Sequence, residues 1–179
     1  MTEANRRINA LRMRARLETL VVLVWGHGDP GPGGSETSKK YWNKRNQIRD
    51  EIQKQFPNSE VLFSESSPLR RGTNDLNDLL DEELVHAKIA DCIIILDVSR
   101  GAHVEVDRFT SIPDIARKMT VLIPEQFVGN TGLVSHVHKH ARVQGFSDIE
   151  LDSCTVATLK SISIVDTAAI NKLIGPNLS

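Results

Sequence analysis

The sequence predicts an α/β fold: a parallel β-sheet of about five strands with helices on both faces. The strongest apolar runs, residues 20–25 and 92–96, are continuous rather than alternating, which is typical of strands buried on both faces. Segments with helical periodicity separate the apolar runs along the chain. Polar or glycine-containing segments follow the runs, as loops follow the strands of such a sheet.

The first half of the chain starts with an amphipathic helix over residues 1–18, whose arginines lie opposite an apolar face. That face consists of Ile8, Leu11, Ala15 and Leu17. The strand at 20–25 ends at a loop, residues 26–38, which is too rich in glycine and proline to be the interior of a helix or strand. A helix over 38–56, stopped by Pro57, and a short strand over 61–63 follow.

In the second half, a helix over residues 76–87 with Asp75 as its N-cap leads to the strand at 92–96. A helix over 102–117, broken at Pro113, precedes a strand at 120–123 that Pro124 ends. The pattern is weaker beyond this point. The expected elements are a helix over 133–144, a strand over 147–151 and a helix over 155–174.

Length and composition restrict the class of protein. A chain of 179 residues with 40% hydrophobic and 25% charged residues suits one globular domain with an appendage. We expect residues 1–18 to form that appendage and 19–179 the domain. A net charge of -1 excludes a globally basic nucleic-acid binder, so direct nucleic-acid binding is not expected.

The expected location is the cytoplasm. No apolar run reaches the ~18 to 20 residues that span a bilayer, so no membrane association is expected. Cys92 and Cys154 lie far apart and form no metal-type pair, which is typical of reduced, buried thiols.

The first glycine-rich loop, which starts with Gly26, His27 and Gly28, is one candidate ligand-binding segment. Backbone N–H groups of such a turn can bind phosphate. However, Pro30 removes one useful N–H, and the P-loop pattern G-x-x-x-x-G-K-[ST] is absent. A ligand-covering loop and an ordinary surface loop both remain open.

The segment after the strand at 92–96 carries the clearest candidate for catalysis. Gly101 stands at a strand-to-helix turn, and Glu105 then falls in the first turn of the expected helix. In a parallel sheet this position lies close to the ligand crevice. A carboxylate there can act as a nucleophile or stabilise an oxocarbenium-like transition state at a sugar C1′. The alternative is that Glu105 only complements the helix dipole.

The segment from Ala90-Asp91 to Gly101-Ala-His-Val-Glu105 resembles the signature region of nucleoside 2-deoxyribosyltransferase-like proteins, and it also resembles TIR domains. Residues 41–52 are similar to the first helix of both families, and residues 61–65 to their second strand and its polar exit. The resemblance covers about residues 19–127. It implies a flavodoxin-like (Rossmann-like) fold and chemistry at C1′ of a ribosyl group.

The resemblance also implies roles for particular residues. Glu105 would be the catalytic carboxylate, and Asp97 would contact a ribose hydroxyl or orient the site. The expected substrate-binding residues are Trp25, Gly26, His27, Ser64, Ser99, Gly101 and His103. NAD or a nucleoside or nucleotide would be the substrate, with no metal and no further cofactor. The Trp-Gly-His exit of the first strand departs from the deoxyribosyltransferase pattern, and the serine and aromatic-cysteine positions of TIR domains are not matched.

Two groups of histidines each have a chemical interpretation and an alternative without chemistry. His103 could protonate a leaving group near neutral pH, but it does not share a helix face with Glu105. His136, His138 and His140 would share one face of a strand, and His136 and His140 one face of a helix, but no H-E-x-x-H motif accompanies them. Metal binding is therefore less favoured than a solvated histidine-rich helix.

A polar segment near the second strand also has two interpretations. Residues 64–67 together with Arg70 and Arg71 could bind a substrate phosphate, and the alternative is a solvated loop.

Three function classes follow. The first is an enzyme that cleaves an N-glycosidic bond, an NAD(P) hydrolase or deoxyribosyltransferase-like glycosidase. The resemblance associates it with bacterial anti-phage defence, and its activity would depend on a homo-oligomer or a regulatory protein partner. The second is a non-catalytic nucleotide sensor similar to SLOG domains. The third is an assembly module of TIR type.

Overall fold

The computed structural model describes residues 3–65, 76–96, 106–128, 141–147 and 156–175. Five parallel strands form one sheet in the order β2-β1-β3-β4-β5. The strands are β1 (Val21–Trp25), β2 (Glu60–Leu62), β3 (Cys92–Leu96), β4 (Met119–Pro124) and β5 (Arg142–Phe146). This strand order is that of flavodoxin-like folds, so the predicted fold class is confirmed.

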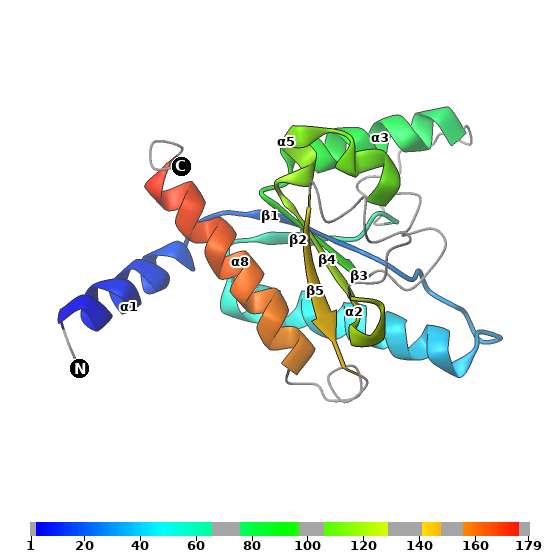
Figure 1. The fold of residues 1–179 in the computed structure, drawn as a ribbon, viewed down its shortest axis with the longest axis horizontal. Helices are drawn as coiled ribbons and strands as arrows, with labels where there is room; N and C mark the ends of the chain where they lie inside the picture. The colour runs from blue at the N-terminus through cyan, green and yellow to red at the C-terminus, as the bar shows by residue number, and fades with distance from the viewer. Residues whose placement is uncertain (1–2, 66–75, 97–105, 129–140, 148–155, 176–179) are drawn as a thin grey trace.

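Helices cover both faces of this sheet (Figure 1). One face packs against α2 (Glu36–Gln55) and α8 (Val156–Ile174) through a core that includes Val24, Ile48 and Val165. The other face packs against α3 (Leu76–Ile89), the helical residues 106–110 and α5 (Pro113–Ala116). β3 is buried at every position, as its unbroken apolar run predicts.

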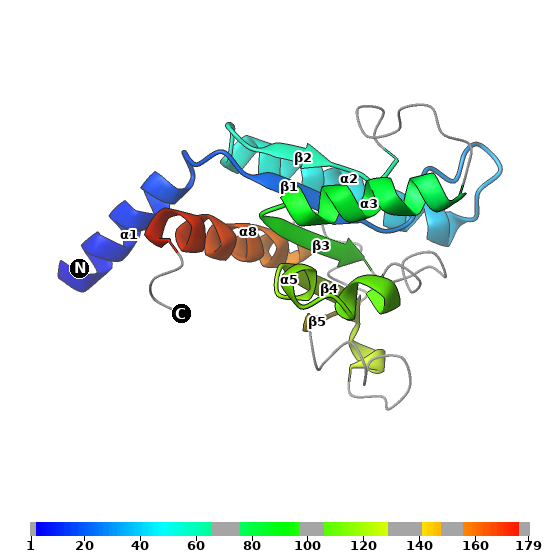
Figure 2. The same cartoon turned by 90° about the horizontal axis from the view of Figure 1, so that it is seen from above.

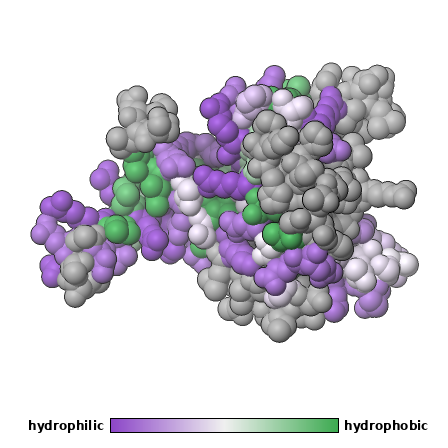
Figure 3. Space-filling view, viewed as in Figure 1, coloured by the Kyte–Doolittle hydropathy of each residue, from purple (hydrophilic) through white to green (hydrophobic). Residues whose placement is uncertain are grey.

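The helix α1 (Glu3–Ala15) extends away from the sheet and meets the rest of the molecule at α8 (Figures 1 and 2). Ala15 is buried in the same core as α8, and Arg16 Nε lies 3.5 Å from a carboxylate oxygen of Asp166. Hydrophilic residues dominate the surface of this projecting helix (Figure 3). Across the described residues, we find no helix with the length and apolarity needed to cross a membrane.

The expected break at Pro113 is present. The helical residues 106–110 end before α5, and Ile112, which precedes the proline, is extended, with φ −104° and ψ 104°. A residue before proline avoids the helical region because the proline ring crowds it.

The expected helix over 133–144 is wrong at its end, and residues 148–151 of the expected strand over 147–151 lie outside the described residues. Residues 142–146 form β5 instead, paired in parallel with β4 from Thr120 to Pro124. A Cβ on Gly145 would lie 2.9 Å from Glu125 Cγ and 2.9 Å from Val128 Cγ2, so this glycine allows the strand to pack closely. Pairing with β4 is a long-range interaction that local periodicity does not reveal. The histidines at 136, 138 and 140 lie outside the described residues.

Candidate functional site

The strand order places the expected crevice at the carboxyl ends of β1 and β3. From β1 the chain crosses through α2 to β2 on one side, and the next strand, β3, lies on the other side of β1. Ligands of such sheets bind outside the carboxyl ends of the strands where the order reverses. The segment after β1 is described, and the segment after β3, residues 97–105, lies outside the described residues.

Gly26 brings the end of β1 tightly against the end of β3. Its φ is +151°, a backbone conformation that residues with a side chain rarely adopt. A Cβ at this position would lie 3.1 Å from Leu96 Cβ and 3.2 Å from the Leu96 carbonyl oxygen. Glycine is therefore required here for a close approach of two strands, directly beside the start of the 97–105 segment.

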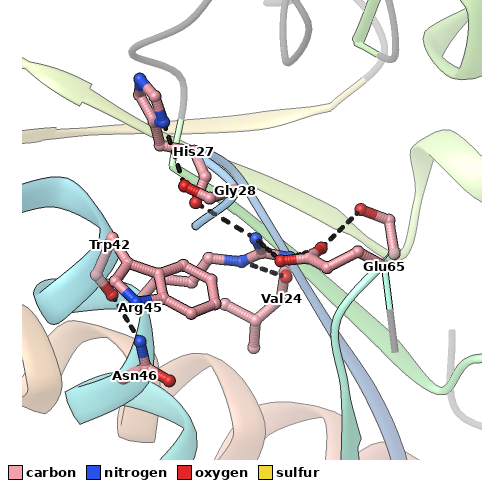
Figure 4. A network of polar contacts seen from close by, with 8 residues as sticks. Val24, His27, Gly28, Trp42, Arg45, Asn46 and Glu65 are labelled. Atoms are coloured by element: carbon pink, nitrogen blue, oxygen red, sulfur yellow. Dashed lines mark hydrogen bonds and ion pairs between the residues drawn. The ribbon is translucent and has the colours of Figure 1, made fainter. Parts of the chain in front are cut away.

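A buried ion pair between Arg45 and Glu65 lies at the same edge of the sheet (Figure 4). The Arg45 atoms Nη1 and Nη2 donate to Glu65 Oε1 and Oε2 at 2.6 and 2.8 Å. The Arg45 side chain is fully buried, and the Glu65 side chain is 27% exposed. Two parallel hydrogen bonds fix a carboxylate more firmly than a single contact does.

Arg45 also binds the backbone at the end of β1. Its Nε donates to the Val24 carbonyl oxygen at 2.9 Å, and Nη1 donates to the His27 carbonyl oxygen at 3.2 Å. The guanidinium carbon lies 4.1 Å from the centre of the Phe63 ring. The spacing of Arg45, Ile48 and Ile52 puts all three on the face of α2 that packs on the sheet. One side chain thus joins α2, the first loop and the exit of β2.

Glu65 is positioned to accept a hydrogen bond from a ligand. Its Oε2 also accepts from Ser64 Oγ at 3.1 Å. An ionised carboxylate offers about four acceptor positions, so these three bonds within the described part of the chain leave about one for another donor. Because the side chain is partly exposed and rigidly held, a sugar hydroxyl or an N–H group of a ligand is a suitable donor for that position.

The described substrate-binding candidates have different positions. Gly26 and Ser64 lie at this edge, and their expected roles in substrate binding stay predictions. His27 is half-buried there, and its Nδ1 lies 3.2 Å from the Gly28 carbonyl oxygen, to which it can donate. The Trp25 indole is buried and lies with its ring centre 5.0 Å from that of Phe109, so it belongs to the core beneath this edge.

The remaining site candidates are not covered by the structure. Asp97, Ser99, Gly101, His103 and Glu105 all lie outside the described residues, as do Arg70 and Arg71. Their expected roles stay predictions. Among the described residues, no three His, Cys, Asp or Glu side chains come together in a way that would hold a metal ion.

Two arginines are functional candidates that the sequence alone does not single out. Arg45 looks like one more charged residue of a helix, although its position on the apolar face is a usable signal. Arg108 follows Glu105 by three positions, and its Nη1 is buried without a hydrogen-bond partner in the described part of the chain. A buried N–H group without a partner is costly, so a ligand or neighbouring segment could satisfy it.

Comparison with known proteins gives one family. No curated protein matches the chain. The profile of the STM3845 retron effector protein family matches residues 42–167, a range that runs from α2 through most of α8 and includes Arg45, Glu65 and Glu105. Because this match covers most of the chain, the protein belongs to the STM3845 family of retron effector proteins.

Proposed function

We propose that this protein is an effector of antiviral defence that cleaves an N-glycosidic bond at the ribosyl C1′ of NAD or of a nucleoside or nucleotide. Membership of a retron effector family supports the defence role. The observation that carries the chemical part is the Arg45–Glu65 pair, a rigid polar group at the sheet edge to which the segment with Glu105 is attached.

In this proposal Glu105 faces C1′ of the bound ribosyl group. The C1′–N bond breaks, and its electron pair leaves with the base or nicotinamide. The carboxylate of Glu105 stabilises or traps the positive charge at C1′, and water then adds there and releases a proton. No metal is required for these steps.

Glu65 has a positioning role in the same proposal. Its remaining acceptor position would bind a ribose hydroxyl, while Arg45 holds the carboxylate in place. Fixed hydrogen bonds of this kind orient the reacting carbon toward the catalytic group. His27 and Gly26, beside this pair, would form the wall of the site.

The test is mass-resolved turnover of a mixed pool of NAD, NADP, nucleosides, deoxynucleosides and their monophosphates. The unmodified protein is compared with Glu105→Gln, which keeps the shape of the side chain but removes its charge. Glu60→Gln is the matched control, because Glu60 is exposed at the start of β2, at the other edge of the sheet.

We expect one base or nicotinamide to be released by the unmodified protein and by Glu60→Gln, and a loss of about 100-fold or more in Glu105→Gln. Equal turnover by all three would remove Glu105 from the mechanism. No release at high protein concentration, with ligand binding retained, would instead indicate the nucleotide-sensor class. No release and no binding, with concentration-dependent assembly, would indicate the assembly class.

A further inference from the structure

A cleft of about 340 Å³ opens at the amino-terminal edge of the sheet, opposite the edge that carries Gly26 and Glu65. The starts of β3, β4 and β5 form its floor through Cys92, Thr120 and Arg142. Its walls come from the end of α3, the turn between α5 and β4, and the C-terminal half of α8. A volume of this size lies within the ~300 to 1,000 Å³ range of small-molecule sites.

Cationic side chains dominate the polar lining of this cleft. They are Arg117, Lys118, Arg142 and Lys172. Asp91 is the only acid among the described residues that line it, and its Oδ2 accepts from Val21 N and from Lys172 Nζ, both at 2.9 Å. These two donors compensate the charge of the carboxylate. The cleft therefore has a net positive charge, and a concave surface concentrates that field.

Both lysines of the cleft are held by hydrogen bonds, and each keeps at least one N–H donor without a partner among the described residues. Lys118 Nζ donates to the Lys88 carbonyl oxygen at 2.7 Å, and Lys172 Nζ donates to the Thr19 carbonyl oxygen at 2.7 Å in addition to Asp91. An ammonium group has three N–H donors. After these contacts, about two remain on Lys118 and about one on Lys172. The carbonyl partner of Lys118 fixes its ammonium group without neutralising it, whereas Lys172 also forms an ion pair with Asp91.

The Arg142 side chain makes no hydrogen bond or ion pair within the described part of the chain, and its strand starts at the floor of the cleft. A guanidinium presents its donors in a planar fork that matches the oxygens of a phosphate. Arg117 adds a second guanidinium to the lining, and its one ion pair among the described residues, with Asp114, is exposed to solvent. The four cationic side chains thus line a space that can hold an anion.

We propose that this cleft binds the phosphate group of a small molecule. The apolar part of the lining, which includes Ile89, Ala90, Ile164 and Ala168, favours a phosphorylated organic molecule over free phosphate. The cleft is separated from the candidate catalytic edge by the full length of the strands, so this inference does not depend on the proposed N-glycosidase activity. A ligand here would contact α3, α8 and three strands at once.

The test is a titration followed by amide nitrogen–proton correlation NMR, with AMP as the probe and adenosine and inorganic phosphate as separate arms. Amides of Thr167, Ala168 and Asn171 report on the cleft. Amides of Gly26, His27 and Glu65 report on the opposite edge. The variant is Arg142→Gln, and Arg7→Gln is the matched control, because Arg7 is an exposed arginine of α1.

We expect AMP to shift the cleft amides, phosphate to shift them at higher concentration, and adenosine to leave them unchanged. Arg142→Gln is expected to weaken AMP binding about tenfold, because a charge-assisted contact is lost. Arg7→Gln should bind AMP as the unmodified protein does. Added salt should weaken the binding, since the sites are solvent-accessible.

Three results would overturn the proposal: no shift of the cleft amides, equal shifts with AMP and adenosine, or an AMP affinity that Arg142→Gln leaves unchanged. Shifts confined to Gly26, His27 and Glu65 would also overturn it, because they would place the nucleotide at the catalytic edge. Equal affinity for AMP and phosphate would support the anion site and assign its ligand to free phosphate.

Discussion

At the scale of single residues, the Arg45–Glu65 pair combines a fully buried cation with a partly exposed carboxylate. Such a pair is costly to break from one side, because the remaining charge stays buried without its partner. Its two hydrogen bonds and the contacts of Arg45 with Val24 and His27 also fix the geometry of the candidate site. A substitution in the Arg45–Glu65 pair should therefore affect both the stability of the fold and the binding of substrate.

The prediction is that Glu65→Gln lowers the free energy of unfolding by about 3 kcal/mol, because the Arg45 guanidinium loses its anionic partner. Urea unfolding followed by circular dichroism measures this change. Glu60→Gln, at the exposed start of β2, the strand that precedes Glu65, should change the free energy of unfolding by less than about 0.5 kcal/mol. Similar effects of the two variants would show that the pair adds little to stability.

Cys92 shows what burial does to a reactive group. The thiol lies in the core, and desolvation, with a smaller contribution from the charge of Asp91, raises its pKa to about 12. The thiolate is the reactive form of cysteine, so this thiol stays protonated and unreactive near neutral pH. This residue is predicted to be a packing residue, consistent with the sequence interpretation.

The reactivity of Cys92 can be measured with a disulfide reagent such as DTNB in a Cys154→Ser background, which leaves one thiol. In the folded protein we expect almost no reaction at pH 8 over minutes, and rapid stoichiometric reaction in denaturant. Fast labelling of the folded protein would contradict the burial of this thiol.

At the scale of elements, the first strand and its exit are specified by two different signals. The apolar run from Val21 to Trp25 predicts the strand, and Gly26 predicts that regular structure ends there. The reason that glycine is needed, the backbone of Leu96 within 3.2 Å, is visible only when β3 lies beside β1. Similarly, the local pattern of residues 142–146 did not reveal β5, because the partner strand β4 determines it.

Gly26→Ala should destabilise the protein by about 1 to 3 kcal/mol, because its backbone conformation is strained for alanine and the new methyl group would crowd Leu96. Gly33→Ala is the control in the same loop, since a Cβ there meets open space. That control should be neutral or slightly stabilising. Thermal unfolding of the two variants side by side measures the difference, and equal melting temperatures would contradict the close approach of the strand ends.

At the scale of the whole molecule, the range matched by the family profile is shorter than the folded unit. The match starts at residue 42, within α2, whereas β1 lies before it and pairs with both β2 and β3. A sheet that loses an inner strand leaves two rows of backbone groups without partners and exposes apolar side chains. A domain that begins at residue 19, as expected from the sequence, contains β1.

We therefore predict that a fragment of residues 19–179 folds and that a fragment of residues 42–179 does not. The longer fragment should be less stable than the full chain, because α8 loses the contacts of Ala15 and Arg16. Circular dichroism and the dispersion of amide NMR signals distinguish the two. Cooperative unfolding of the 42–179 fragment would refute the central role of β1.

The sequence by itself determined the class of fold, because continuous apolar strands and amphipathic helices are local patterns that burial imposes directly. It also led to candidate substrate-binding residues after β1 and after β2, among them Gly26 and Ser64. Only the tertiary structure decided that Arg45 pairs with Glu65, that Leu96 packs closely against Gly26, and that four cations line one cleft at the opposite edge. These features join residues that are distant in sequence, and the interactions between them depend on the distances and desolvation that folding creates.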